Sequence, residues 1–125
     1  MKFCYFDDYR LGVVKDDRVV DITALAQHLP HRDSRDLIIG VIEQYDDLRP
    51  KIEDALNGEE GVLISQVRLR PPVPRPGKID CMAVNYMEDG TLEKAAPINA
   101  FHKTANSLIG QDDKMVLPDA PAGIF

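Results

Sequence analysis

Side chains able to do chemistry gather in one short stretch in the second half of the chain. Asn85, Tyr86, Glu88 and Asp89 lie within five residues, directly after the apolar run 79–84. An amide and a phenol can bind a polar substrate, and a carboxylate can act as a general base. An apolar strand that ends in clustered polar groups is a common way to build a binding site. Acidic residues followed by a glycine are equally typical of an ordinary surface turn.

The elements around this stretch indicate two parts joined by a proline-rich linker. Four of the six residues in 71–76 are prolines, which lack an amide donor and cannot join a central sheet. We therefore predict a small N-terminal α+β domain over 1–70, a stiff linker over 71–77, and the beginning of a second domain over 78–125. In that second domain we expect strands at 79–84, 98–103 and 115–117.

The first 70 residues have the pattern of a small antiparallel meander covered by helices. Acidic turns separate three apolar runs, and such a short sheet needs other elements to cover its apolar face. The predicted strands are 2–6, 9–14 and 18–22, and further strands follow at 62–64 and 67–70. Three helices are predicted between them: one over 23–29, one capped by Asp33 or Ser34, and one over 47–56 with Pro50 in its first turn. The capped helix carries an apolar stripe at helical spacing, which predicts core: Leu37, Ile38, Val41, Ile42 and Tyr45.

Charge and composition exclude several classes of function. The net charge is −6, and residues 1–60 alone hold 14 acids against 8 bases. An acidic surface repels phosphate, so nucleic acid and anionic membranes are poor partners. No apolar run reaches the length of a membrane span, and no secretory signal is visible, so we expect a cytoplasmic protein. Cys4 and Cys81 are expected to be reduced core residues, and His28 and His31 to be exposed rather than a metal pair.

Several short motifs resemble one enzyme family in their order and spacing. They are Pro76-Gly77-Lys78-Ile79, Asn85-Tyr86, 100–103, 106–110, Asp112-Asp113 and 116–118. Together they resemble the entry to the catalytic domain of the fumarylacetoacetate hydrolase family. The resemblance covers Pro76 to the end of the chain, and it implies a mixed, β-rich fold for this part.

The resemblance also implies a chemistry. Enzymes of this family bind a divalent ion, Mg²⁺, Mn²⁺ or Ca²⁺, through a Glu-x-Glu pair and a later Asp. The ion stabilises the enolate formed from a small oxo or diketo acid. Hydrolytic members activate water through a His–Glu dyad just after the Asn-Tyr pair and break a carbon–carbon bond. The family further implies a homodimeric, catabolic parent enzyme.

Carried over residue by residue, the resemblance assigns Asn85, Tyr86, Phe101 and Lys103 to substrate binding. The usual histidine falls at or near Asp89 and is absent here. The nearby acids, Glu88, Asp89 and Glu93, are therefore the candidate catalytic groups. Two alternatives stay open: a carboxylate acts as the base, or the enzyme forms the enolate without water, as decarboxylating and isomerising members do. Lys103 is also typical of a solvated lysine on an edge strand, and His102 more typical of a solvated histidine.

Metal ligands are not expected within this chain. No Glu-x-Glu follows Gly61. We therefore expect the N-terminal portion of a family enzyme, truncated within its catalytic domain. This portion alone should neither hold the ion tightly nor turn over substrate. The rival hypothesis comes from another class, a non-catalytic α+β binding or dimerisation module that uses its acidic N-terminal domain for contacts.

Overall fold

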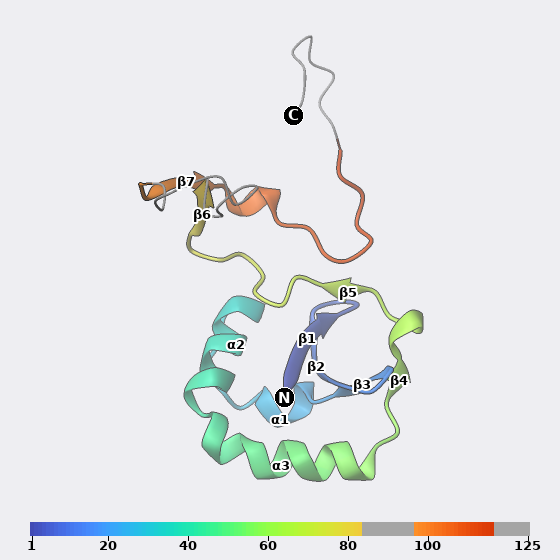
Figure 1. Cartoon of the computed structure of the whole chain (residues 1–125). Coiled ribbons are helices and arrows are strands. Elements are labelled where there is room, and N and C mark those ends of the chain that lie inside the picture. The colour runs from blue at the N-terminus through green and yellow to red at the C-terminus, as the bar shows by residue number, and fades with distance from the viewer. Residues whose placement is uncertain (84–96, 117–125) are drawn as a thin grey trace.

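The computed structural model describes residues 1–83 and 97–116 and shows an α+β fold (Figure 1). Two separate antiparallel sheets lie on either side of the proline run. The first contains β1 (Lys2–Phe6), β2 (Arg10–Lys15), β3 (Arg18–Asp21), β4 (Val62–Leu63) and β5 (Leu69–Arg70). The second contains β6 (Ile79–Ala83) and β7 (Asn99–Lys103). The predicted fold class is thus confirmed, whereas the boundaries 1–70, 71–77 and 78–125 stay a prediction.

The first sheet has the strand order β4-β3-β2-β1-β5, with all neighbours antiparallel. Its meander follows the predicted acidic turns, and Lys15 pairs with Arg18 across the two-residue turn at Asp16-Asp17. Because side chains alternate along a strand, the register puts Phe3, Tyr5, Leu11 and Val13 on one face, and a different apolar set on the other. Both faces therefore need a cover.

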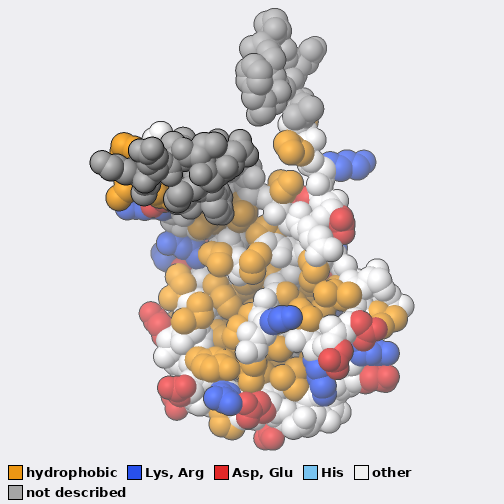
Figure 2. All heavy atoms as spheres, in the orientation of Figure 1, with side chains coloured by type: hydrophobic (Ala, Val, Ile, Leu, Met, Phe, Trp, Pro, Cys, Tyr) orange, Lys and Arg blue, Asp and Glu red, His pale blue; other side chains and the backbone are white. Residues whose placement is uncertain are grey.

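Three helices cover the Tyr5 face, as Figure 1 shows. They are α1 (Thr23–Ala26), α2 (Ser34–Glu43) and α3 (Tyr45–Gly58). The Asp33 side chain caps α2 and accepts hydrogen bonds from the backbone N–H groups of Arg35 and Asp36 at 3.0 and 3.1 Å. The core on this side joins side chains of the sheet and all three helices, including Tyr5, Leu11, Leu29, Val41 and Ile52. Charged side chains line the lower rim in Figure 2, where α3 lies in Figure 1.

Some helix predictions were wrong in detail. Ile42 was assigned to the core stripe, but its side chain points outward and is 64% exposed. The buried stripe of α2 is Leu37, Ile38 and Val41, and the predicted stripe residue Tyr45 begins α3 instead. The first helix ends at Ala26 rather than at residue 29, although Leu29 is buried. The third helix begins two residues earlier than predicted, so Pro50 lies beyond its first turn.

The other face of the sheet is covered by the chain between its two edge strands. Cys4, Phe6 and Val19 pack there against Val67, Leu69 and further residues of this segment. The segment crosses from β4 to β5 through the short helix η1 (Ile64–Gln66). The predicted strands at 62–64 and 67–70 are therefore shorter than expected, two residues each, because the crossing chain must turn between the edges.

Beyond the first sheet, the proline run is partly buried. Pro71 and Pro74 are buried, and β6 follows at Ile79. After β7 comes a short helix, η3 (Ala105–Ser107), and then a turn at Gln111-Asp112. Within the described residues, Met115 and Val116 do not form the strand predicted at 115–117. Both side chains are exposed.

Candidate functional site

The strand pair β6–β7 holds the predicted site residues that the structure describes. Its register pairs Ile79 with Lys103 at one end and Ala83 with Asn99 at the other. Since paired residues in an antiparallel sheet share a face, Phe101 and Lys103 lie on the face of Ile79, Cys81 and Ala83. The β6 residues of this face are half-buried, and β7 is exposed along its whole length.

Phe101 and Lys103 lie next to each other, as expected of residues two apart on a strand. The ammonium nitrogen of Lys103 lies 5.9 Å from the centre of the Phe101 ring, within the range of a cation–π contact. A cation held over an aromatic ring, with further donors free, can bind a carboxylate while the ring packs against apolar carbon. The pair is therefore chemically suited to an organic acid.

The opposite face carries a polar pair that the sequence analysis did not predict. His102 Nδ1 lies 2.5 Å from a carboxylate oxygen of Asp80, and both side chains are exposed. Asp80 and His102 are 22 residues apart, so only the register of β6 with β7 brings them together. Nothing in the sequence pattern identifies that register, which is why the pair was missed. The imidazole, kept in place by the carboxylate, has the arrangement of a base with its orienting group.

The remaining predicted residues, Asn85, Tyr86, Glu88, Asp89 and Glu93, lie outside the described residues. The chain leaves β6 at Ala83, beside Asn99, whereas Lys103 lies at the other end of the pair, four residues away. At about 3.3 Å per residue that separation is about 13 Å. The convergence of Lys103 with the Asn85–Glu93 stretch on one cleft therefore stays a prediction.

No described residue is assigned to a metal centre. Over residues 1–83 and 97–116, no three His, Cys, Asp or Glu side chains gather closely enough to hold an ion. Asp80 and His102 would supply two ligands at most. The cysteines do not add to them: Cys4 and Cys81 are free, and burial raises the pKa of the Cys4 thiol to about 11. Among the same residues, no helix is long and apolar enough to cross a membrane.

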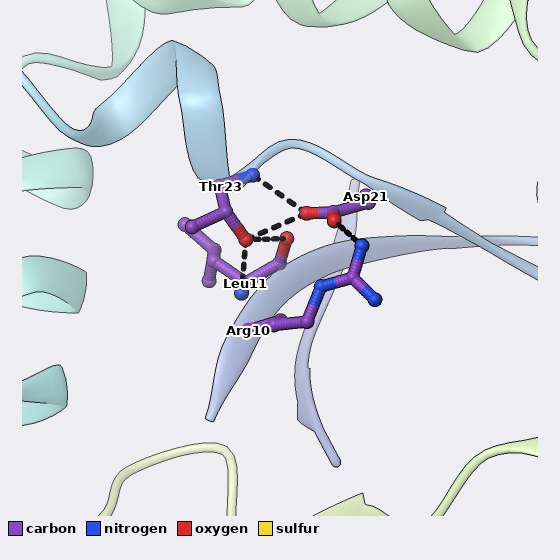
Figure 3. Close-up of polar contacts among 4 residues, drawn as sticks. All are labelled: Arg10, Leu11, Asp21 and Thr23. Atoms are coloured by element: carbon purple, nitrogen blue, oxygen red, sulfur yellow. Dashed lines mark hydrogen bonds and ion pairs between the residues drawn. The ribbon is translucent and has the colours of Figure 1, made fainter. Parts of the chain in front are cut away.

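A second polar cluster, drawn in Figure 3, joins β2, β3 and α1. The Asp21 carboxylate accepts hydrogen bonds from the backbone N–H of Thr23 at 2.9 Å and from its hydroxyl at 2.6 Å. The same hydroxyl accepts the N–H of Leu11 at 2.9 Å, and Arg10 pairs with Asp21 from the outside. The cluster joins groups that end one strand pair and begin a helix, so we read it as structural.

The charge of this cluster is stabilised in the folded state. Partial burial alone would raise the pKa of Asp21, but the hydrogen bonds from Thr23 and the guanidinium of Arg10 outweigh it and hold that pKa below the ordinary value of 3.8. The ionised form is thus the native one at neutral pH.

The fold is similar to that of a solved enzyme. Maleylpyruvate hydrolase from Sphingobium sp. SYK-6, in complex with manganese(II) and pyruvate, superposes on 97% of this chain with a TM-score of 0.79 and 38% identity. A second structure of maleylpyruvate hydrolase from the same source gives a TM-score of 0.77. The chain covers 44% and 43% of these two proteins.

Two curated proteins are also similar to this chain in sequence. The maleylpyruvate hydrolase of Aquipseudomonas alcaligenes is 37% identical over 89 residues, which are 69% of this chain and 30% of that protein. The mitochondrial oxaloacetate tautomerase of Xenopus laevis is 28% identical over 117 residues, which are 88% of this chain and 35% of that protein. The chain thus spans about a third of the length of these relatives. No protein-family model matches it.

Fold and relatives together define an α+β chain that is similar to maleylpyruvate hydrolases. The chain belongs to the fumarylacetoacetate hydrolase family, as its motifs predicted.

Proposed function

We propose that the chain is the N-terminal portion of a metal-dependent hydrolase that cleaves a carbon–carbon bond in a small oxo or diketo acid. The observation that carries this proposal is the likeness over 97% of the chain to a maleylpyruvate hydrolase that holds manganese(II) and pyruvate. That likeness extends through both sheets, and so includes β6 and β7, on which the candidate residues lie.

In this proposal Lys103 and Phe101 bind the substrate acid, together with Asn85 and Tyr86. Lys103 supplies positive charge to a carboxylate, and the Phe101 ring limits how the substrate can lie against the sheet. Glu88, Asp89 or Glu93 would take the proton from water in place of the family histidine. We expect the protein to act in the cytoplasm and as a homodimer.

The divalent ion would supply Lewis-acid stabilisation of negative charge on substrate oxygen. Manganese is the ion that the similar structure holds, and magnesium or calcium would suit the same hard oxygen ligands. The described residues do not fit the role of its ligands, since no suitable cluster is found among them.

A second candidate activity is enolate formation without hydrolysis. The relative named oxaloacetate tautomerase favours it, as does the missing histidine near Asp89. Both activities require a carbonyl acid and a proton acceptor; they differ in whether water attacks. Because the chain alone should be inactive, the choice between them must be tested on the protein encoded by the complete reading frame.

The test is an assay of that complete protein with Mn²⁺, using maleylpyruvate and other acylpyruvates for cleavage and oxaloacetate for tautomerisation. Cleavage supports the hydrolase, and tautomerisation without cleavage supports the alternative. Lys103→Met should raise KM several-fold with little loss of stability, whereas Lys78→Met, which removes an exposed lysine just before β6, should leave KM unchanged. If neither activity is found with any divalent ion, both proposed activities are rejected, and a binding or dimerisation role is favoured instead.

A further inference from the structure

The segment that carries β6 and β7 leaves the first sheet at β5 and returns to it. After η3 the chain runs back over β5, as Figure 1 shows. At Gly110 the approach is so close that an added Cβ atom would lie 2.6 Å from the carbonyl oxygen of Leu69 and 3.3 Å from the Cα atom of Arg70. β5 is an edge strand of the five-stranded sheet, so the returning chain covers an otherwise open edge.

One carboxylate both shapes the returning turn and attaches it. Asp113 Oδ2 accepts the N–H of Gly110 at 2.8 Å, and the N–H of Asp113 reaches back to the Gly110 carbonyl at 3.3 Å. Asp113 Oδ1 accepts a hydrogen bond from Nε of Arg68 at 3.0 Å and a second from its terminal nitrogen. Hydrogen bonds from Arg68 and Gly110 hold the pKa of Asp113 below its ordinary range, consistent with an ionised carboxylate.

Arg68, which binds Asp113, is itself held in place by contacts with Asp7. The backbone N–H of Arg68 donates to the side chain of Asp7 at 3.0 Å, and the N–H of Asp7 donates to the Arg68 carbonyl at 2.8 Å. Nε of Arg70 donates to the Asp7 carbonyl at 2.7 Å. Arg68 thus extends from a backbone held in place on both sides, which reduces the entropy lost when its guanidinium binds Asp113.

We infer that Arg68 and Asp113 are positioning residues that close the base of the excursion that carries residues 71–83 and 97–109. They fasten the 110–113 turn to the edge of β5 and thereby restrict where β6 and β7 lie. Gly110 is required because any side chain would separate the turn from Leu69. This inference rests on contacts within the described residues and does not depend on the proposed function.

Hydrogen exchange on the 125-residue chain, read by mass spectrometry, tests the inference with a matched pair of glycine variants. Gly110→Ala should raise exchange in β7 and in residues 107–113 by at least about tenfold while β1 to β3 keep their protection, because the base of the excursion opens. Gly58→Ala is the control, since a Cβ atom there meets nothing within 4 Å. It should leave exchange in β7 unchanged.

A second pair of variants tests the ion pair without changing the backbone. Arg68→Met should raise exchange in β7 about two- to fivefold, and Arg68→Lys should fall between it and the unmodified chain, since lysine keeps the charge but not the two-nitrogen contact. Arg49→Met is the control, because Arg49 pairs with Glu53 at 2.8 Å on an exposed helix surface far from this turn in sequence. The inference would be overturned if exchange in β7 is unchanged in both Gly110→Ala and Arg68→Met. It would also be overturned if the effects of Arg68→Met and Asp113→Asn simply add in the double variant.

Discussion

The hydroxyl of Tyr5 donates a hydrogen bond to the backbone carbonyl of Ser34 across 2.5 Å. Tyr5 lies on β1 at the centre of the main core, and Ser34 begins α2. The hydroxyl is the polar end of an otherwise apolar side chain, and its hydrogen bond joins the sheet to the helix that covers it. Buried phenols normally have such a partner, and here the partner is one carbonyl group.

Removing this hydroxyl should cost measurable stability. We expect Tyr5→Phe to lower the free energy of unfolding by about 1 to 2 kcal/mol, because the Ser34 carbonyl loses its donor while the ring keeps its packing. Urea unfolding followed by circular dichroism measures the change. Tyr9→Phe is the control, because that tyrosine is exposed and should shift the midpoint little. An equal loss in both variants would show that the Ser34 contact contributes nothing specific.

Because of the same tyrosine, we expect the folded chain to lose stability in alkali. Burial, reinforced by the negative charge of Asp33, raises the pKa of Tyr5 from 10.0 to about 12. A raised folded-state pKa favours the protonated phenol, so its contribution is complete below pH 10 and is lost as the pH rises towards 12. Absorbance titration at 295 nm should therefore show one of the four tyrosines ionising later than the others. Tyr5→Phe should remove that late step.

Two neighbouring residues of α2 that were both predicted to lie in the core differ in burial. Val41 is fully buried and Ile42 is 64% exposed. We expect Val41→Ala to cost about 2 kcal/mol through lost burial and an unfilled cavity. Ile42→Ala should change stability by less than about 0.5 kcal/mol. Unfolding midpoints of the two variants measure the difference, and similar midpoints would contradict the packing of α2.

How far the sequence predicts this protein depends on the range of the interactions involved. Local signals succeeded: the Asp33 cap, the turn at Asp16-Asp17 and the three strands of the meander follow from neighbouring residues. The stripe of α2 was correct except for Ile42, which is exposed, and Tyr45, which begins α3. A helix with so many apolar positions does not itself specify which edge of the stripe faces the sheet. Its tertiary neighbours decide that.

Long-range pairing accounts for what was not predicted. The Asp80–His102 pair and the Arg68–Asp113 contact join residues 22 and 45 positions apart, and each needs a register or a docking that no local pattern encodes. Val116 has strand propensity, yet neither it nor Met115 lies in a strand of the described structure. For the candidate site, Phe101 and Lys103 were found adjacent on β7, while the roles given to Asn85, Tyr86, Glu88, Asp89 and Glu93 stay predictions carried by the family motifs.

The cluster at Asp21 predicts how the chain responds to acid. Because the pKa of Asp21 is held below 3.8, its stabilising contribution is present above that pH and is lost as the pH falls through the lowered folded-state value. We expect Thr23→Val to lower the free energy of unfolding by about 1 to 2 kcal/mol at neutral pH, since the hydroxyl no longer donates to Asp21 or accepts from Leu11.

The pH dependence separates this effect from a simple loss of packing. Between neutral pH and pH 3, Thr23→Val should lose less stability than the unmodified chain, because one contribution that favours the ionised Asp21 is already gone. Arg10→Met removes a half-exposed partner of Asp21, which also lies over the Phe6 ring, and should cost less than about 1 kcal/mol. If Thr23→Val and the unmodified chain lose stability in parallel on acidification, Thr23 does not stabilise the charge.

Several large apolar side chains are exposed in the described part of the chain beyond β5. Ile98 is 89% exposed and Val116 87%, and Phe101, Ile109 and Met115 are also exposed. Hydrophobic side chains of this kind are visible in the upper part of Figure 2, beyond the first sheet. Apolar patches of this sort are typical of surfaces that contact other protein segments.

We therefore expect the 125-residue chain to self-associate reversibly. Sedimentation velocity at increasing concentration should show a rising average mass, and a double variant, Ile98→Lys with Val116→Lys, should reduce it, because burying two ammonium groups opposes association. Ile42→Lys is the matched control: it adds a charge at an exposed isoleucine on α2, away from this surface, and should leave the association unchanged. A chain that stays monomeric at all concentrations, or one in which Ile42→Lys has the same effect as the double variant, would show that the apolar surface beyond β5 does not drive contacts between copies.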